Sequence, residues 1–215
     1  SSYIFYLRPN VRFSDATPFD ARIAKFSLLR AIAPGSSNAQ AQALAEVAGI
    51  DILDPLTVRI RLKAPDAGLP VLLAWGDCVM VAPASAGKLA SDPVGTGPFR
   101  YANWARGDRL TLVRNDAYWG AKPALRRIDY RFISDPAAAY AAVKTHAVDL
   151  FPDYPAPENL AQLRADPSLR VTTAPSEGEV ILALNNAKGP LRDLRVRRAI
   201  AFAIDRRAVI DGAMY

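Results

Sequence analysis

The sequence has very few of the residues that crosslink chains or bind metals. Its 215 residues include one cysteine, Cys78, one histidine, His146, and two methionines. A single cysteine cannot form an internal disulfide, which argues against a small disulfide-stapled secreted module. A zinc site needs three or four clustered ligands, so the lone histidine argues against one. We interpret His146 as a surface or capping residue, and we expect neither a metal site nor a cofactor.

Long apolar runs and blocks of like charge are also missing. The longest apolar stretch, residues 68–76, is far shorter than the ~20 residues of a membrane-spanning helix. Lysine and arginine outnumber the acids 27 to 21, giving a net charge of +6, but the basic residues are spread along the chain. The arginines between 192 and 207 fit a solvated helix face, and no zinc-finger or helix-turn-helix pattern accompanies them. We therefore expect no nucleic-acid partner.

What the sequence does contain favours a folded α/β protein. Hydrophobic residues make up 51% and charged residues 22%, enough apolar material for one large domain or two small ones. The first residues, SSYIFYLRPN, show no secretory leader, so we expect a fragment whose ends do not report targeting.

The first part of the chain alternates between strand and helix patterns. Residues 57–62 place Val58, Ile60 and Leu62 on one face of a strand and the two arginines on the other. Thr17 as cap, with Pro18 and Asp20 after it, predicts the start of a helix. The remaining predictions are a strand at 3–7, a helix from 36–38 to Gly49, and a mostly buried apolar segment at 71–83.

The second part begins with three consecutive strands, which argues against a plain doubly wound parallel sheet. Asp135 followed by Pro136 predicts the start of a helix, and Asp193 the cap of a last helix over 194–210. The other predicted elements are strands at 99–104, 109–115, 127–133, 169–174 and 179–185, a turn at 105–108 and a loop at 151–160.

The glycine turn at 95–98 (Gly-Thr-Gly-Pro) is not a phosphate-binding loop. Such a loop needs a lysine after its last glycine and amide donors along its backbone, whereas Pro98 has no amide hydrogen. A dinucleotide-binding turn would lead into a helix, but a strand follows here. These glycines more simply permit unusual backbone angles or the close approach of another segment.

No set of residues points to catalysis. A nucleophile elbow (GxSxG) is missing, and a serine triad would have to use His146 as its base. A paired-carboxylate hydrolase needs two acids in one cleft, and most candidates have a turn or cap explanation. These candidates are Asp15, Asp20, Asp77, Asp135, Asp149 and Asp153. We expect no enzyme.

Several segments together resemble family 5 of the extracellular solute-binding proteins, the periplasmic oligopeptide, dipeptide and nickel-complex receptors of ABC importers. The segments, in order, are FYLRPNVRFSDATPFDARIAKFSLLRAI, DPLTVRIRLKAPDAGLPVLLA, VGTGPFRYANW, LVRNDAYWGAKPALRRIDYRFISDPAAAYAAVKTHAVDL and VILALNNAKGPLRDLRVRRAIAFAIDRRAVI. Two departures stand out. Ala16 occupies a usual glycine position, so its turn must avoid a positive φ or tolerate strain, and His146-Ala147 replaces the usual Gly-Glu.

The resemblance implies a mixed α/β fold: one lobe of a type II periplasmic-binding-protein-like clamp, with a mixed sheet flanked by helices and part of a smaller subdomain. Residues 1–85 would be part of the small subdomain of lobe I. Residues 86–215 would be the central part of lobe I, ending near the hinge to a second lobe that is missing here.

The resemblance implies that the protein binds di- or oligopeptides in a cleft and delivers them to a membrane permease, as a periplasmic or lipid-anchored monomer. Candidate ligand contacts are Trp75, Asp77 and Asn185. Each also has a structural explanation: Trp75 as a core residue, Asp77 as a turn residue and Asn185 as a cap at the end of a strand. Other possible functions are ligand sensing in a cytoplasmic transcription regulator, or a receptor for a sugar or nickel chelate. Residues 75–83 lack the arginine or histidine that a nickel-complex receptor would use.

Overall fold

The computed structural model describes residues 1–174, 181–210 and 212, in two compact units, Ser1–Phe132 and Ile133–Tyr215. We call them unit 1 and unit 2. In the described part, no helix has the length and apolar character needed to cross a bilayer.

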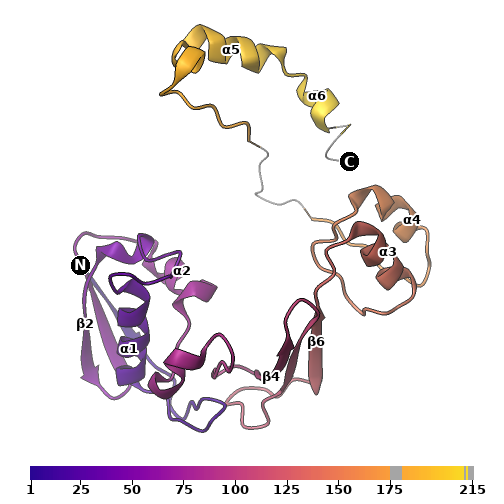
Figure 1. The fold of residues 1–215 in the computed structure, drawn as a ribbon. Coiled ribbons are helices and arrows are strands. Elements are labelled where there is room, and N and C mark those ends of the chain that lie inside the picture. Colours follow the sequence, from indigo (N-terminus) through magenta and orange to yellow (C-terminus); the bar gives the residue numbers. More distant parts are fainter. Residues whose placement is uncertain (175–180, 211, 213–215) are drawn as a thin grey trace. The chain divides into compact units, whose positions relative to one another are not determined.

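Unit 1 begins with a three-stranded antiparallel sheet that carries the core. β3 (Thr57–Leu62) lies between β1 (Ser2–Tyr6) and β2 (Val47–Asp54), and α1 (Ala21–Ile32) packs against the sheet (Figure 1). Val58, Ile60 and Leu62 are at most 5% exposed and face the core. On the opposite face, both arginines of β3 form ion pairs with Asp51 of β2. The predicted alternation in this strand is confirmed.

The predicted start of the first helix is wrong by one turn of sequence. Asp20, and not Thr17, caps α1: its Oδ1 accepts hydrogen bonds from the amides of Arg22 (2.9 Å) and Ile23 (3.2 Å). Thr17 and Pro18 belong instead to a tight hairpin in which the Phe13 amide donates to the Thr17 carbonyl (2.8 Å). The backbone pairing of this hairpin, between Arg12 and Pro18, outweighs the capping signal.

That hairpin contains a strained residue. Ala16 has a φ of 70°, in the left-handed region that side chains with a Cβ avoid. Its amide donates to the Phe13 carbonyl (2.9 Å), and its carbonyl accepts from the Arg12 guanidinium (3.0 Å). These contacts hold the turn, so the chain tolerates the strain instead of avoiding the positive φ.

We expect Ala16→Gly to raise the free energy of unfolding by about 0.5–1 kcal/mol. Glycine removes a cost of ~1–2 kcal/mol for the left-handed conformation, and the extra freedom of the unfolded chain offsets part of this gain. Urea unfolding measures the difference. Ala24→Gly, in the middle of α1, is the control and should lower stability. A loss of stability in Ala16→Gly would contradict the strain argument.

The helix predicted to run from residues 36–38 to Gly49 does not form. Residues 36–38 have no regular structure, residues 39–42 make turns, a short 3-10 helix (η1) covers Ala43–Glu46, and β2 begins at Val47. Gly49 therefore lies inside a strand. The pairing of β2 with β3 places Ile50 opposite Ile60. This pairing makes the segment a strand in spite of its helix-like spacing of apolar residues.

The segment predicted to be mostly buried is only half buried. It folds into α2 (Leu69–Leu73) and η2 (Gly76–Cys78), followed by η3 (Pro83–Lys88). Cys78, Val81 and Ala82 face the core, whereas Val71, Trp75 and Val79 are at least 50% exposed. Short helical turns send neighbouring apolar side chains in opposite directions, which a continuous apolar run does not reveal.

The three consecutive strands form a second antiparallel sheet, as predicted. β5 (Arg109–Arg114) lies between β4 (Phe99–Ala105) and β6 (Arg127–Arg131). The expected mixed sheet is not seen in the described residues, whose strands form two antiparallel sheets. The fold remains mixed α/β.

The glycine turn is held by hydrogen bonds from the segment after β5. Asn115, only 4% exposed, donates from Nδ2 to the Gly97 carbonyl (3.1 Å), and its amide donates to the Pro98 carbonyl (2.8 Å). The Trp119 indole donates to the Thr96 carbonyl (3.0 Å). The glycine turn and the Asn115–Trp119 motif therefore form one structural unit.

Unit 2 is built from short helices (Figure 1). Asp135 caps α3 and Asp193 caps α5, as predicted. The predicted last helix is interrupted at Ile204, because Asp205 caps a separate helix. The helices are α3 (Pro136–Lys144), η4 (Pro157–Asn159), α4 (Leu160–Arg164), η5 (Gly189–Arg192), α5 (Leu194–Ala203) and α6 (Arg206–Val209).

The two strands predicted in unit 2 are not seen in the residues that the structure describes. Residues 169–174 and 181–185 have no strand pairing, and residues 179–180 lie outside the described part. A strand needs a neighbour that exchanges backbone hydrogen bonds with it. No described strand pairs with either segment, so β-type side-chain alternation alone does not produce a sheet.

An ion pair in unit 2 leads to a pH prediction. Asp166 accepts hydrogen bonds from the Lys144 ammonium and from the Ser168 hydroxyl (2.6 Å). These bonds hold the pKa of Asp166 well below its ordinary value, and the bond from Lys144 has the largest effect. The stabilisation is complete above the unfolded-state pKa of ~3.9 and is lost as pH falls below it. We expect the stability difference between the native protein and Asp166→Asn to be constant from pH 7 to about 5 and to shrink below about pH 4. Unfolding midpoints against pH measure this, and a difference that grows on acidification would contradict it.

Candidate functional site

Two of the three predicted ligand contacts lie on one exposed turn of unit 1. Trp75 precedes η2 and is 50% exposed, and Asp77 is exposed one residue before the buried Cys78. The side-chain amide of Asn38 donates to the Asp77 carbonyl (3.1 Å), which fixes the turn. Both side chains are open to solvent, so they are available to a ligand, and their binding role stays a prediction.

The third predicted contact, Asn185, belongs to unit 2. Its side-chain oxygen accepts a hydrogen bond from the amide of Ala187 (3.0 Å), which stabilises the turn that follows. Asn185 is exposed, and its side-chain nitrogen makes no hydrogen bond with any described residue. This nitrogen remains available as a donor, while the oxygen has a structural role.

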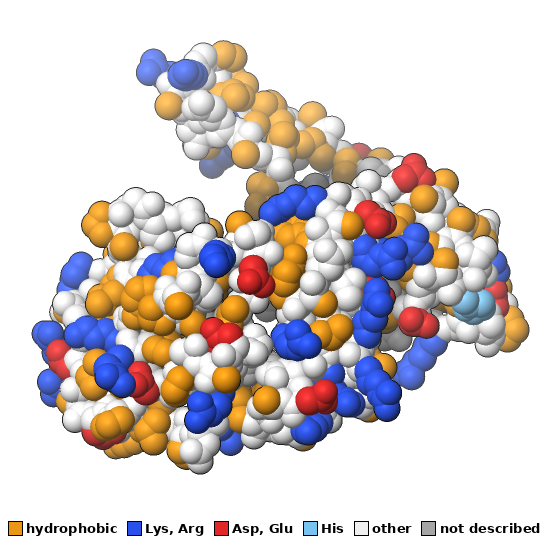
Figure 2. Space-filling view, turned by 60° about the horizontal axis from the view of Figure 1, so that its bottom comes forward, with side chains coloured by type: hydrophobic (Ala, Val, Ile, Leu, Met, Phe, Trp, Pro, Cys, Tyr) orange, Lys and Arg blue, Asp and Glu red, His pale blue; other side chains and the backbone are white. Residues whose placement is uncertain are grey.

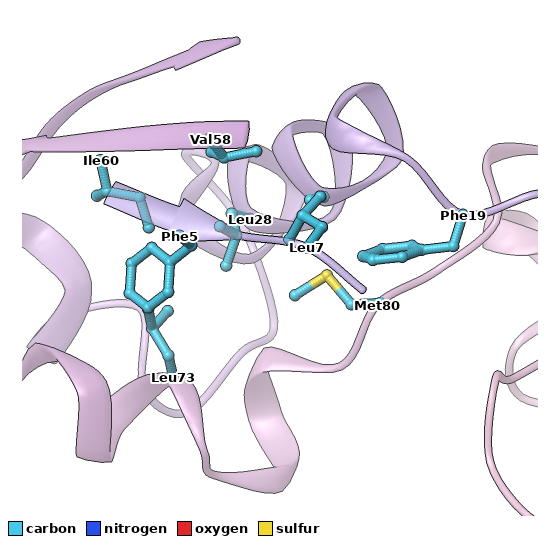
Figure 3. Close-up of a pocket in the computed structure, with 9 residues that line it drawn as sticks. Phe5, Leu7, Phe19, Leu28, Val58, Ile60, Leu73 and Met80 are labelled. Atoms are coloured by element: carbon cyan, nitrogen blue, oxygen red, sulfur yellow. The ribbon is translucent and has the colours of Figure 1, made fainter. Parts of the chain in front are cut away.

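An apolar cavity of about 250 Å³ lies inside unit 1. Its base is formed by the buried residues Leu28, Val58 and Ile60, and Leu73 at the end of α2 lies across from them (Figure 3). The remaining lining residues are also apolar: Phe5, Leu7, Phe19, Ala24 and Met80. Such a cavity can accept an apolar group but cannot orient a ligand by side-chain hydrogen bonds. Sequence patterns indicated these residues only as core.

The ionisable groups of the described residues do not form a catalytic arrangement. The carboxyl groups with shifted pKa values all have them lowered, and for five the main cause is a hydrogen bond from arginine or lysine. Burial, and then the nearby charge of Asp77, raises the pKa of Cys78, so its thiol is a poor nucleophile. Among the described residues, no three metal-binding side chains cluster.

Surface charge is dispersed. Figure 2 shows Lys and Arg side chains scattered among Asp, Glu and apolar groups on the visible face, without one continuous basic patch. Several arginines are occupied by neighbouring carboxylates, as in the pairs Arg114–Asp116 and Arg127–Asp129. This arrangement gives little support to recognition of a nucleic-acid backbone.

Curated relatives align with nearly the whole chain. A probable D,D-dipeptide-binding periplasmic protein of Escherichia coli (strain K12) is 30% identical over 221 residues, covering 99% of this chain and 42% of the relative. A glutathione-binding protein of Salmonella paratyphi A is 29% identical over 218 residues, with coverages of 99% and 42%. The chain therefore spans less than half the length of these relatives.

Solved structures confirm the predicted type II periplasmic-binding-protein fold. NikA from Brucella suis, in complex with Fe(III)-EDTA, has a TM-score of 0.83 and 29% identity, covering 100% of this chain and 45% of that one. MoaA from A. tumefaciens R10, in complex with mannopinic acid, has a TM-score of 0.83 and 27% identity, with coverages of 98% and 44%.

The family itself is shown by a model that matches the full length. The model describes the middle region of bacterial extracellular solute-binding proteins, family 5, and it covers residues 1–215. The glycine turn and the Asn115–Trp119 motif, which carried the resemblance in the sequence, are hydrogen-bonded to each other in the structure. The chain belongs to family 5 of the bacterial extracellular solute-binding proteins.

Proposed function

We propose that this chain is part of the substrate-binding component of an ABC importer, which binds di- or oligopeptides in a cleft between two lobes and delivers them to a membrane permease. The observation that carries the proposal is the family match over residues 1–215. The functions of the relatives, D,D-dipeptide binding and glutathione binding, favour peptide-like ligands. Binding without chemical change agrees with the absence of a catalytic arrangement in the described residues.

In this proposal, residues 1–85 belong to the small subdomain of lobe I and residues 86–215 to its central part. The second lobe corresponds to the part of the relatives that this chain does not span. The relative from E. coli is periplasmic. We place the complete protein in the periplasm or on a lipid anchor, as a monomer that docks on its permease.

The proposed contacts have chemistry suited to peptides. The exposed indole of Trp75 offers an apolar face, the Asp77 carboxylate accepts hydrogen bonds from ligand amides, and the Asn185 amide nitrogen donates to ligand carbonyls. Such groups recognise the peptide backbone with little dependence on its side chains.

Native mass spectrometry of the complete protein purified from its host tests the ligand class. We expect a bound mass that is released on denaturation and sequenced as a peptide or peptide mixture. The Fe(III)-EDTA complex of the similar NikA makes a metal chelate the second candidate. A released chelate, sugar or opine would overturn the peptide proposal. A DNA-binding domain ahead of residue 1 in the complete protein would favour the sensor function instead.

We expect Trp75→Ala to weaken peptide affinity about tenfold, since exposed aromatic residues often contribute more than 1 kcal/mol to binding. Calorimetric titration with the peptide recovered from the host measures this. Val71→Ala, at an even more exposed position of the neighbouring α2, is the control and should bind like the native protein. Equal affinities in all three proteins would remove Trp75 from the site.

A further inference from the structure

The turn that carries Trp75 and Asp77 is anchored to the rest of unit 1 from two sides. On one side, the side-chain amide of Asn38 donates to the Asp77 carbonyl (3.1 Å), 39 positions away in the sequence. On the other side, the amide of Val81, which is 2% exposed, donates to the Ser27 hydroxyl of α1 (2.8 Å). The backbone of the segment is therefore fixed, while the side chains of Trp75 and Asp77 are open to solvent.

Asn38 is itself held by hydrogen bonds within its own segment. Its Oδ1 accepts from the amide of Gln40 (2.8 Å), and its backbone amide donates to the Ser36 hydroxyl (3.2 Å). Its carbonyl accepts from the amide of Ala41 (3.1 Å). The side-chain oxygen thus serves the local turn, and the side-chain nitrogen serves Asp77. Asparagine meets both requirements, whereas an aspartate of the same shape would keep the first bond and lose the second.

The second anchor lies in the core. Ser27 is 3% exposed, and its hydroxyl donates to the Ile23 carbonyl (2.8 Å) while it accepts from Val81. Between the two anchors, Cys78 belongs to the core cluster, and its amide donates to the Trp75 carbonyl (3.1 Å). These bonds order the short segment before any ligand arrives, so binding has little left to order.

We propose that Asn38 is a positioning residue for peptide binding and that Ser27 supports it from the core. This inference rests on the proposed function, because it requires Trp75 and Asp77 to contact the peptide. Asn38 acts through the backbone of the turn: it holds the two exposed side chains where the ligand meets them. A turn that is ordered in the free protein binds more tightly than a loose one, since ordering on binding opposes affinity.

Hydrogen exchange of the complete protein without ligand tests the anchoring. We expect Asn38→Asp to speed exchange of the Cys78 amide about threefold to tenfold, the effect of one lost hydrogen bond. Ser27→Ala should speed exchange of the Val81 amide at least as much, because this buried amide loses its partner.

Gln42→Glu makes the same amide-to-carboxylate change as Asn38→Asp at an exposed position without a side-chain capping bond, and it should leave both exchange rates unchanged. Asn38→Asp carries the test if Ser27→Ala does not fold. Native exchange rates in Asn38→Asp would overturn the proposal.

Calorimetric titration with the peptide recovered from the host separates positioning from contact. We expect Asn38→Ala, which removes the donor without adding a charge, to weaken peptide affinity about threefold to tenfold, with a less favourable binding entropy. Gln42→Ala is the control and should bind like the native protein. In a variant that already carries Trp75→Ala and Asp77→Ala, Asn38→Ala should cost less than about twofold, because the contacts that it positions are gone.

The titrations distinguish failure of this inference from failure of the proposed function. Normal affinity in Asn38→Ala, with a loss in Trp75→Ala, overturns the positioning role and leaves the peptide site intact. An equal loss on adding Asn38→Ala to the native protein and to the Trp75→Ala, Asp77→Ala variant shows that Asn38 acts elsewhere, which also overturns it. A native protein that binds no peptide removes the proposed function, and this inference with it.

Discussion

Ile60→Ala is expected to lower the free energy of unfolding by about 2–5 kcal/mol. Ile60 is 1% exposed at the centre of β3, between Tyr3 of β1 and Ile50 of β2. The side chain also lines the apolar cavity of about 250 Å³. Its removal would enlarge a space that is already unfilled, so the neighbouring side chains cannot easily close the gap. The lost burial and the larger void both lower the free energy of unfolding.

Urea unfolding of Ile60→Ala and Ile52→Ala separates core burial from strand propensity. Ile52, on the paired strand β2, is 40% exposed, so its alanine variant should lose less than about 1 kcal/mol. If Ile60→Ala does not fold, Ile60→Val should still show a loss of about 0.5–1.5 kcal/mol. Equal losses in the two alanine variants would show that β3 does not carry the core.

Asn115→Ala is the second large effect, with an expected loss of about 1–3 kcal/mol. The side chain of Asn115 joins the Gly97 carbonyl (3.1 Å) to the amide of Ala117 (3.1 Å). Alanine would remove both hydrogen bonds and empty a side-chain position that is 4% exposed. The Gly97 carbonyl is half-buried and Ala117 is exposed, so each lost hydrogen bond costs about 0.5–1.5 kcal/mol. The glycine turn would also lose one of its connections to the segment after β5.

Thermal or urea unfolding measures this loss, with Asn103→Ala as the matched control. Asn103 lies on β4, its side chain is exposed, and its replacement should change stability by less than about 0.5 kcal/mol. A loss of similar size in both variants would mean that the Asn115 hydrogen bonds do not hold the turn.

Sequence patterns predicted the elements whose signals are local. The alternation at 57–62 needed only its own side chains, and the caps Asp135 and Asp193 act within one turn of their helices. Errors arose where backbone pairing between segments decides the structure. Residues 47–49 became part of β2 because β3 pairs with them, and Thr17 joined a hairpin with Phe13 instead of capping α1.

The candidate sites show the same division. Trp75, Asp77 and Asn185 were located through a resemblance, and the structure confirms only that they are exposed. The apolar cavity of unit 1 escaped prediction because its walls come from segments far apart in sequence, such as β1 with α2. The position of Ala16 was the exception: a usual glycine position predicted either an avoided positive φ or strain, and the backbone shows strain.

Equilibrium dialysis of the complete protein against the peptide recovered from its host, followed by mass analysis of the peptide, tests the central claim most directly. The account predicts one peptide retained per protein molecule and recovered with its mass unchanged. A shortened or otherwise modified peptide would show that the protein is an enzyme, and absence of retention would show that it is not a receptor for that peptide.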